Sequence, residues 1–451
     1  MPSRPLRHAV VAGGSIAGLL AARVLSNHFE AVTLVERDAL ARTPEPRKGV
    51  PQGPHAHILL LRGQAILQSL FPGLGEELCE GGAVVINSGQ ELAWYYAGSW
   101  RAQFQNELPL LSMSRPLLET TIAKRVSALP NIRVLERACV NGFRTGAVRT
   151  IRGVHVNARG SAQTKEIEAD LVIDATGRGS ATPRWLRELG FDAPESELVP
   201  ARVTYASCTF QQPERRPKWR ALAISGSPPK RVGVIFPIEG DRWLVSLGSF
   251  FDEPTPRDHS AVLACARSLT IPDLYEAIRN LEPLSDVVRY RFSGSQRRRY
   301  ERLNRFPEGL IVVGDAVCSF NPVYGQGMTV SAIEAECLDQ VLARAKCDGG
   351  LPPEFGLRWF RTIKPVVGSA WDGALLEDFR FPELSGGRPA RLKPLQWYMD
   401  RVHRATQRSP AVSEQFYRVA GLLDPPSALF RPRIVADIFF GGLRTTPQKK
   451  R

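Results

Sequence analysis

The stretch "HAVVAGGSIAGLLAARVLSNHFEAVTLVER", His8 to Arg37, decides the fold of this chain. It begins with a continuous apolar run at Ala9 to Ala12, passes through a glycine turn into apolar residues at helical spacing, and ends in a second apolar run at Val32 to Val35. A strand, a glycine turn, a helix and a second strand in this order are typical of a dinucleotide-binding βαβ unit. The sequence therefore predicts an α/β fold whose first turn binds a dinucleotide.

The turn of this unit has the small residues that a pyrophosphate requires. Gly13, Ser15 and Gly18 occupy the three positions of the GxGxxG pattern. In that pattern the first residue allows a tight turn, the second lets the backbone approach a phosphate, and the third lets the helix pack on the strand. Ser15 replaces the middle glycine with a small side chain that still fits. The predicted cofactor-binding residues of the turn are Gly13, Gly14, Ser15, Ile16, Ala17 and Gly18.

Glu36 ends the second strand, close to the offset of roughly 20 residues at which an acidic side chain accepts hydrogen bonds from ribose hydroxyls. A carboxylate there would repel a 2′-phosphate, so this site favours FAD or NAD over NADP. We include both Glu36 and the following Arg37 among the predicted cofactor-binding residues.

A second stretch, "GLIVVGDAVCSFNPVYGQGMTVSAIEAECL" from Gly309 to Leu338, repeats the order strand, loop and helix. Its apolar run ends in Gly314-Asp315, and a loop rich in Pro and Gly separates that aspartate from a helical pattern that begins at about Met328. A helix N-terminus stabilises a nearby anion by roughly 0.3 to 2 kcal/mol. The pattern raises the question of whether a ligand is held between the aspartate and the helix or whether this is a plain strand-loop-helix connection.

The composition is that of a globular protein with two or three domains, since the chain has 451 residues and an apolar share of 43%. Its formal net charge is +14. The basic residues are scattered and are not interleaved with aromatic residues, which disfavours nucleic-acid binding. The charge favours a solvated basic surface with some attraction for phosphate-bearing cofactors or an acidic carrier protein.

The seven cysteines are widely spaced and form no CxxC pair, so the sequence predicts neither a disulfide framework nor a zinc site. His55 and His57 have a spacing seen in metal sites, but no Asp, Glu or Cys ligand lies nearby in the sequence, and we predict no metal. No segment approaches the roughly 18 uninterrupted apolar residues of a membrane span. We therefore expect a cytoplasmic protein.

Further motifs accompany these two stretches. They are "RKGVPQG" at Arg47 to Gly53, Arg115 at the start of the helical "RPLLETTIAKRV", and "DATG" at Asp174 to Gly177. With "GGSIAG" and "GDAVCSFNPVYGQG", they make the chain up to about residue 345 resemble the flavoprotein monooxygenases of the para-hydroxybenzoate hydroxylase fold. The resemblance implies a Rossmann-like FAD-binding domain of the glutathione-reductase type, an inserted β-sheet substrate domain and a helical C-terminal region.

The expected boundaries follow from these patterns. We assign residues 1–73, 113–185 and 299–350 to a discontinuous FAD-binding domain, 74–112 and 186–298 to the substrate domain, and 351–451 to the helical C-terminal region. The segment 74–112 reads as irregular and rich in aromatic residues. We expect the C-terminal "SALFRPRIVADIFFGGLR" to pack internally, with contact to a membrane surface as the alternative.

The resemblance also implies roles for individual residues. The glycine turn would hold the FAD pyrophosphate, Glu36 the adenosine ribose, and Asp315 the ribityl hydroxyls, while the helix that follows Gly327 would face the flavin N1 and C2 carbonyl region. Asp174 belongs to a motif associated with pyridine nucleotide binding, but "DATG" departs from the usual Asp-Gly pair. Further cofactor-binding residues implied by the resemblance are Arg47, Val50, Arg115, Gly314, Asp315, Pro322, Gly325, Gly327 and Met328.

Within this family the chain most resembles the bacterial olefin epoxidases of polyether assembly, of the monensin and lasalocid type, on strings such as "VERDAL", "SRPLLE", "RRRYERL" and "NPVYGQGM". Such an enzyme reduces FAD with NAD(P)H, captures O₂ as a flavin C4a-hydroperoxide and epoxidises an alkene. The implied substrate is a hydrophobic polyketide-like or terpenoid intermediate, free or bound to a carrier protein. Epoxidation needs no protein base, and no catalytic residue is predicted.

Other activities of the same fold stay open. They are hydroxylation of an aromatic or polyketide substrate, reduction of a prenyl double bond, and lipid binding without catalysis. Halogenation is disfavoured because the chain lacks a WxWxIP string. The aromatic residues predicted to contact the substrate are Phe320, Tyr324, Phe236 and Tyr96.

Overall fold

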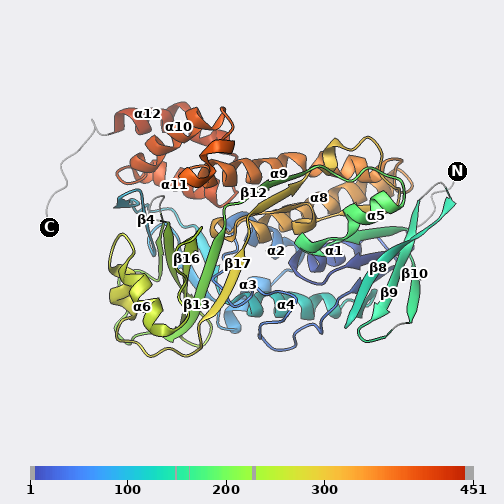
Figure 1. The fold of residues 1–451 in the computed structure, drawn as a ribbon, viewed down its shortest axis with the longest axis horizontal. Coiled ribbons are helices and arrows are strands. Elements are labelled where there is room, and N and C mark those ends of the chain that lie inside the picture. Colours follow the sequence, from blue (N-terminus) through green and yellow to red (C-terminus); the bar gives the residue numbers. More distant parts are fainter. Residues whose placement is uncertain (1–5, 148–149, 162, 226–229, 442–451) are drawn as a thin grey trace.

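The computed structural model describes residues 6–147, 150–161, 163–225 and 230–441. In Figure 1, a small sheet lies at one end of the molecule and a large sheet at the other, with long helices between them. The helical C-terminal region packs beside the large sheet.

A parallel five-stranded sheet forms the centre of the first half of the molecule, with strand order β19-β11-β1-β2-β7. Its inner strands are buried on both faces, which explains why they read as continuous apolar runs. The strands are β1 His8–Ala12, β2 Ala31–Val35, β7 Ile132–Leu135, β11 Leu171–Asp174 and β19 Leu310–Val312.

Four helices pack around this sheet: α1 Ile16–Leu25, α4 Arg115–Ser127, α8 Gly327–Cys347 and α9 Phe355–Asp378. Helix α1 contacts both α4 and α8, and α8 contacts α9. The buried Trp359 of α9 donates its indole N–H to the carbonyl of Val312 in β19, 2.9 Å away. This bond ties α9 to the strand that leads into the Gly314-Asp315 turn.

A seven-stranded sheet of order β17-β13-β16-β15-β14-β4-β5 forms the core of the second half. Its pairs are antiparallel except for β14 and β4, which run parallel. The strands are β4 Leu92–Tyr96, β5 Ser99–Trp100, β13 Val203–Gln211, β14 Ala221–Ile224, β15 Arg231–Ile238, β16 Arg242–Phe250 and β17 Val288–Phe292.

The two faces of this sheet have different neighbours. Alternate residues such as Cys208, Val245 and Ile235 form an apolar cluster with helices α6 His259–Arg267 and α7 Asp273–Ile278. Their sequence neighbours point to the opposite face because side chains alternate along a strand. That face carries Tyr205 and Ser246, and it lies against the loop that follows β19.

The segment 74–112, which we expected to be irregular, contains a helix and four short strands. They are α3 Leu74–Glu80, β3 Val84–Asn87, β4, β5 and β6 Pro109–Ser112. The strands have two to five residues each, and β4 pairs with the distant β14. Such short runs give no readable period, so the local sequence could not reveal them.

The remaining elements complete the two halves and the C-terminal region. The strands are β8 Ala138–Thr145, β9 Ile151–Ala158, β10 Thr164–Glu168, β12 Ser196–Val199, β18 Ser295–Arg298 and β20 Cys318–Ser319. The helices are α2 Leu61–Leu70, α5 Thr182–Glu188, α10 Leu392–Ala405, α11 Pro410–Ala420 and α12 Pro432–Phe440.

Arg101 joins the large sheet to the C-terminal helices. Its Nη1 donates to Thr406 Oγ1 at 2.6 Å, and its guanidinium lies 4.4 Å from the ring centroid of Trp94 and 4.0 Å from that of Phe416. Arginine is well suited to this position because its planar cation stacks on aromatic faces.

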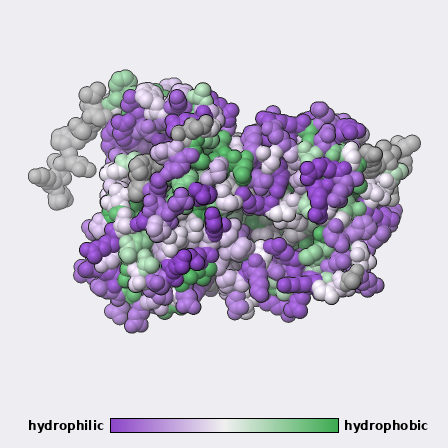
Figure 2. Space-filling model, viewed as in Figure 1, coloured by the Kyte–Doolittle hydropathy of each residue, from purple (hydrophilic) through white to green (hydrophobic). Residues whose placement is uncertain are grey.

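The face shown in Figure 2 is mostly hydrophilic, with small and scattered hydrophobic areas. Among the described residues, no helix combines the length and the apolar character needed to cross a bilayer.

We expect Arg101→Ala to lower the free energy of unfolding by about 2 to 4 kcal/mol, since it removes a buried stacking group and leaves a cavity between sheet and helices. Chemical denaturation measures this change. Arg305→Ala, at an exposed arginine, is the matched control and should change stability by less than about 0.5 kcal/mol. Equal stability of the two variants would contradict the joining role of Arg101.

Candidate functional site

At the turn after β1, the backbones of this turn, of helix α1 and of the loop after β11 approach one another closely. A Cβ atom on Gly18 would lie 1.7 Å from the carbonyl oxygen of Gly13, and one on Gly13, whose φ is +102°, would lie 2.5 Å from the carbonyl oxygen of Ala175. No side chain fits at either position. The backbone of the turn is therefore exposed to whatever lies beyond the end of β1.

Glu36 is buried at the end of β2 and faces this turn. Its Oε2 accepts the N–H of Gly14 at 2.5 Å, and its Oε1 accepts the N–H of Asp38 at 3.0 Å. Its Oε1 also forms an ion pair with Arg47 Nη1 at 3.1 Å. Since a carboxylate offers about four lone-pair sites, about one remains for a hydroxyl donor.

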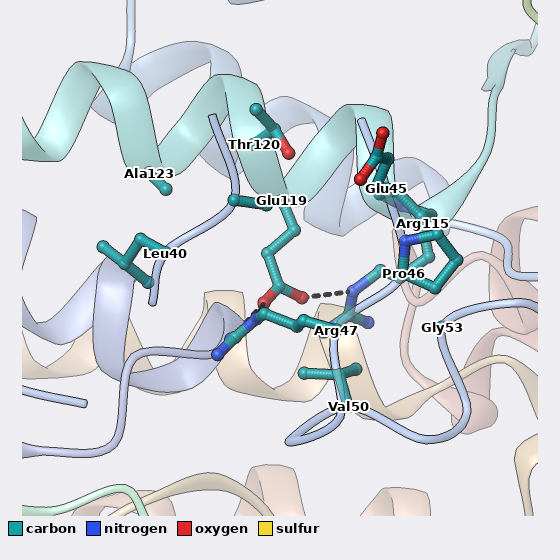
Figure 3. Close-up of a pocket in the computed structure, with 12 residues that line it drawn as sticks. Leu40, Glu45, Pro46, Arg47, Val50, Gly53, Arg115, Glu119, Thr120 and Ala123 are labelled. Atoms are coloured by element: carbon teal, nitrogen blue, oxygen red, sulfur yellow. Dashed lines mark hydrogen bonds and ion pairs between the residues drawn. The ribbon is translucent and has the colours of Figure 1, made fainter. Parts of the chain in front are cut away.

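Two arginines converge on one carboxylate beside the turn (Figure 3). Arg47 Nε donates to Glu119 Oε1 at 2.8 Å, and Arg115 Nε donates to Glu119 Oε2 at 3.0 Å. Arg47 also donates to the carbonyl of Gly14 at 2.8 Å, and Arg115 donates to Ser15 Oγ at 3.2 Å. Arg47, Arg115 and Glu119 line a small pocket together with Val50 and Gly53.

These residues fit the pyrophosphate and ribose of FAD. The N-cap residue Ser15 makes no side-chain hydrogen bond to the first turn of α1, so the helix N-terminus is open to an anion. Two guanidinium groups lie beside it, and a carboxylate with acceptor capacity lies behind it. An anionic diphosphate joined to a hydroxylated sugar matches this set of groups.

The Gly314-Asp315 turn lies next to the glycine turn after β1. A Cβ atom on Gly314 would lie 2.7 Å from the Cβ of Ala17 in α1, and one on Gly177 would lie 4.0 Å from the Cβ of Asp315. The GGSIAG turn, the DATG loop and the Gly314-Asp315 turn therefore meet at one edge of the parallel sheet, where its strands end. Burial raises the pKa of Asp315, while the positive charges of Arg115, Arg178 and Arg298 oppose that rise.

The loop before α8 leaves room on one side. Apart from its chain neighbours and its own helix, the nearest atom that a Cβ on Gly327 would meet among the described residues is Asp315 Oδ1, at 3.9 Å. Helix α8 has no side-chain cap on its first turn. Glycine is required at position 325 by the protein's own packing, because its φ is +64° and a Cβ there would lie 2.4 Å from Ile58 Cγ2.

The carboxylate of Asp174 has its hydrogen-bonding capacity filled by residues of the loop that follows it. Its carboxylate accepts hydrogen bonds from Thr176 N and Oγ1, from Ser180 Oγ and from Thr182 Oγ1, at distances of 2.5 to 2.9 Å. The side chain is buried and fixes the turn after β11. This bonding gives Asp174 a structural role.

His55 and His57, for which the sequence predicts no metal, lie between the glycine turn and the large sheet. His55 Nδ1 lies 2.7 Å from Ser207 Oγ, and its buried Nε2 has no hydrogen-bond partner among the described residues. Burial lowers the pKa of His55 to about 4. Burial and the charge of Arg115 lower that of His57 to about 3. Both imidazoles are therefore neutral at neutral pH.

A buried polar cluster holds the loop before α8 against the large sheet. Asp378, at the end of α9, accepts hydrogen bonds from Tyr324 OH at 2.6 Å and from Asn321 Nδ2 at 3.3 Å. Asn321 Oδ1 accepts from Tyr205 OH of β13 at 3.1 Å. Burial raises the pKa of Asp378 to about 7, although its hydrogen bonds oppose that rise.

The other predicted residues have varied surroundings. Arg37 donates to the carbonyl of Gly49 at 3.0 Å, and Tyr96 donates to Glu377 Oε2 at 2.8 Å. Phe320 and Met328 belong to the main hydrophobic core. Pro322 is exposed, and Phe236 is half-buried on β15.

Two carboxylates of the site were not predicted. Glu119 follows Arg115 by four residues on one helix, a spacing that brings side chains together and could have suggested the pair. Asp378 lies in an ordinary helical sequence, and only the fold brings it to Tyr324. No local signal could have identified it.

We expect Asp378→Asn to change the pH dependence of stability. The pKa of Asp378 is higher in the folded protein than the usual value of 3.8, so the folded state binds a proton that the unfolded state releases between about pH 4 and pH 7. The native protein should therefore lose stability relative to Asp378→Asn as the pH rises through that window, by about 1.4 kcal/mol per unit of pKa difference.

Denaturant unfolding of both proteins at several pH values measures the effect. Asp348→Asn, at a residue just beyond α8, is the control. Parallel stability profiles for native protein and Asp378→Asn would show that the carboxyl is ionised throughout the window.

Comparison with known proteins gives clear relatives. No family model matches the chain. The chain is 32% identical over 436 residues to Protein Rv3254 of Mycobacterium tuberculosis (strain ATCC 25618 / H37Rv), which covers 93% of this chain and 90% of that protein. It is 28% identical over 357 residues to 6-methylpretetramide 4-monooxygenase of Streptomyces rimosus, which covers 75% of each chain.

Among solved structures, PqsL of Pseudomonas aeruginosa, a probable FAD-dependent monooxygenase, aligns with a TM-score of 0.61 at 18% identity, over 84% of this chain and 98% of that chain. Flavin-dependent halogenases align comparably. These structures bear on the fold, and they confirm the predicted combination of a parallel sheet, an inserted sheet and a helical C-terminal region. The chain belongs to the same family as Protein Rv3254, and its fold is that of FAD-dependent monooxygenases and halogenases.

Proposed function

We propose that the chain inserts one oxygen atom of O₂ into a hydrophobic natural-product intermediate of polyketide or terpenoid type, with NAD(P)H as the reductant and epoxidation of an alkene as the reaction. The observation that carries the proposal is the convergence of the GGSIAG turn, the DATG loop and the GDA turn at one sheet edge. FAD supplies the redox and oxygen-activating chemistry when it is bound there.

The protein's own residues bind and orient. Arg47, Arg115 and the N-terminus of α1 would hold the pyrophosphate, and Glu36 would accept from the ribose. The uncapped N-terminus of α8 would favour negative charge on a flavin ring held near Gly327. The large sheet contacts the loop before α8 through Tyr205 and Asn321, and exclusion of water there would strengthen each of these interactions.

The face of the sheet toward the loop is mainly apolar and aromatic. Val203, Tyr205, Val232, Phe250 and Phe292 form one cluster there, together with Phe381 from beyond α9. These side chains are buried against one another, and a hydrophobic substrate with few polar groups would bind beside them. The neutral His55, with its free Nε2, can make one hydrogen bond to a carbonyl or hydroxyl of that substrate.

Hydroxylation of an aromatic polyketide is a second candidate, and one observation favours it. A phenol is activated by a general base whose pKa lies near the working pH. The Asp378 and Tyr324 pair provides a carboxyl with a pKa of about 7 beside the loop before α8. The relative from Streptomyces rimosus is by name a monooxygenase of 6-methylpretetramide.

Substitution of Glu36 in the cofactor site should weaken the binding of FAD. Glu36→Gln keeps the size of the side chain but removes its charge and one acceptor oxygen, so we expect the dissociation constant for FAD to rise about 10-fold or more. Quenching of flavin fluorescence on binding measures it. Glu30→Gln, at an exposed position, is the control, and equal affinities of the two variants would exclude Glu36 as a ribose ligand.

The reaction itself is tested with purified protein reconstituted with FAD. Anaerobic bleaching of the flavin by NADPH should be followed, after admission of air, by one added oxygen in an apolar alkene substrate. A gain of two hydrogens would identify a double-bond reductase. A protein that takes up no FAD would contradict the whole assignment.

The variant Asp378→Asn, which removes the carboxylate of this pair, separates the two oxygenation reactions. Epoxidation needs no base, so we expect the turnover number to change by less than a few-fold. If the enzyme hydroxylates a phenol through this pair, loss of the base should lower the rate by roughly 10²- to 10⁴-fold. Product structure by NMR, as epoxide or phenol, gives an independent answer.

A further inference from the structure

The outer surface of the C-terminal helices carries four exposed aromatic side chains, which we call the aromatic patch. Their exposed fractions are 52% for Trp397, 49% for Phe430, 41% for Phe439 and 64% for Phe440. The ring centroids of Trp397 and Phe439 are 6.2 Å apart, and Phe430 stacks on Tyr398, which in turn lies 6.4 Å from Phe439. The patch is therefore largely continuous, unlike the single exposed apolar residues that any protein surface has.

Internal packing does not require these side chains. Helices α10 and α12 bury Val402, His403, Ile434 and Ile438 against the rest of the molecule. Trp397, Arg401 and Arg404 follow at the spacing i, i+4, i+7, so they share the outer face of α10. Arg433 and Phe440 are likewise seven residues apart on α12, and both are exposed. Figure 1 shows the two helices at the outer edge of the molecule.

The surroundings of the patch are basic. Residues 388–441 contain nine Arg and Lys against four Asp and Glu. Within the described part of the chain, Arg401, Arg404, Arg408 and Arg433 form no ion pair, and Arg401 lies over the ring of Trp397 at 4.1 Å. Arginines that lie along aromatic rings can keep their charge in water while their stems cover apolar surface.

We propose that this surface docks on an anionic lipid bilayer, with the aromatic patch at the level of the headgroups and the arginines against lipid phosphates. Exposed Trp and Phe beside unpaired Arg are the combination that binds such an interface. A second copy of this chain is a poorer occupant, since it would bring the same unpaired arginines together. Docking here would also place the enzyme where hydrophobic compounds concentrate.

The test is flotation of the FAD-loaded full-length enzyme with vesicles of phosphatidylcholine, alone or mixed with phosphatidylglycerol. We expect binding to the mixed vesicles only, weakened by added salt. Trp397→Ser with Phe440→Ser should lower the partition coefficient roughly 10-fold or more. Arg404→Gln and Arg433→Gln should each lower it about 5-fold.

Trp100→Ser is the matched control, because Trp100 is 37% exposed but lies on β5 outside the patch. It should bind as the native enzyme does. Equal binding of native enzyme and the Trp397 and Phe440 double variant would overturn the proposal. So would equal binding to the two kinds of vesicle. A lower molecular mass of the double variant by light scattering, without vesicle binding by the native enzyme, would instead assign the patch to self-association.

Discussion

The close approach of β1, α1 and the loop after β11 is the constraint on which the rest of the structure depends. Gly13 and Gly18 touch through backbone atoms alone, and Ala175 closes the other side. Because nothing larger fits, the N-terminus of α1 is brought to the end of the parallel sheet, next to Gly314 and Asp315. Each later element is arranged around that edge: α4 supplies Arg115, α8 begins beside it, and the large sheet covers it.

The sequence predicts the parts of this site whose signals are local. The glycine turn, Glu36 and the Gly314-Asp315 turn are read from residues that are neighbours in the chain, and the structure brings them together. Asp378 and Ser207 could not be predicted, because their partners Tyr324 and His55 lie far away in sequence. The strands β3 to β6 were missed for a related reason: each is too short to show alternation, and the pairing that defines β4 is made with a distant strand.

The loop between Gly314 and Gly327 is held at both ends by carboxyl groups of unusual basicity. Glu334 of α8 accepts the N–H of Gly314 at 2.6 Å, and burial raises its pKa to about 8. Asp378 holds Tyr324 near the other end. Both carboxyl groups can therefore exchange protons near neutral pH.

The parallel pairing of β14 with β4 has a consequence for how the chain is made. β4, at Leu92–Tyr96, cannot take its place in the large sheet until β14, at Ala221–Ile224, has left the ribosome. The parallel sheet is also completed late in synthesis, because its strand β19 follows both β4 and β14 in the chain. Contacts between segments so far apart close large loops and form slowly. During synthesis, the aromatic strand "LAWYY" therefore emerges before its partner, and its unpaired edge is exposed to association with other chains until β14 follows.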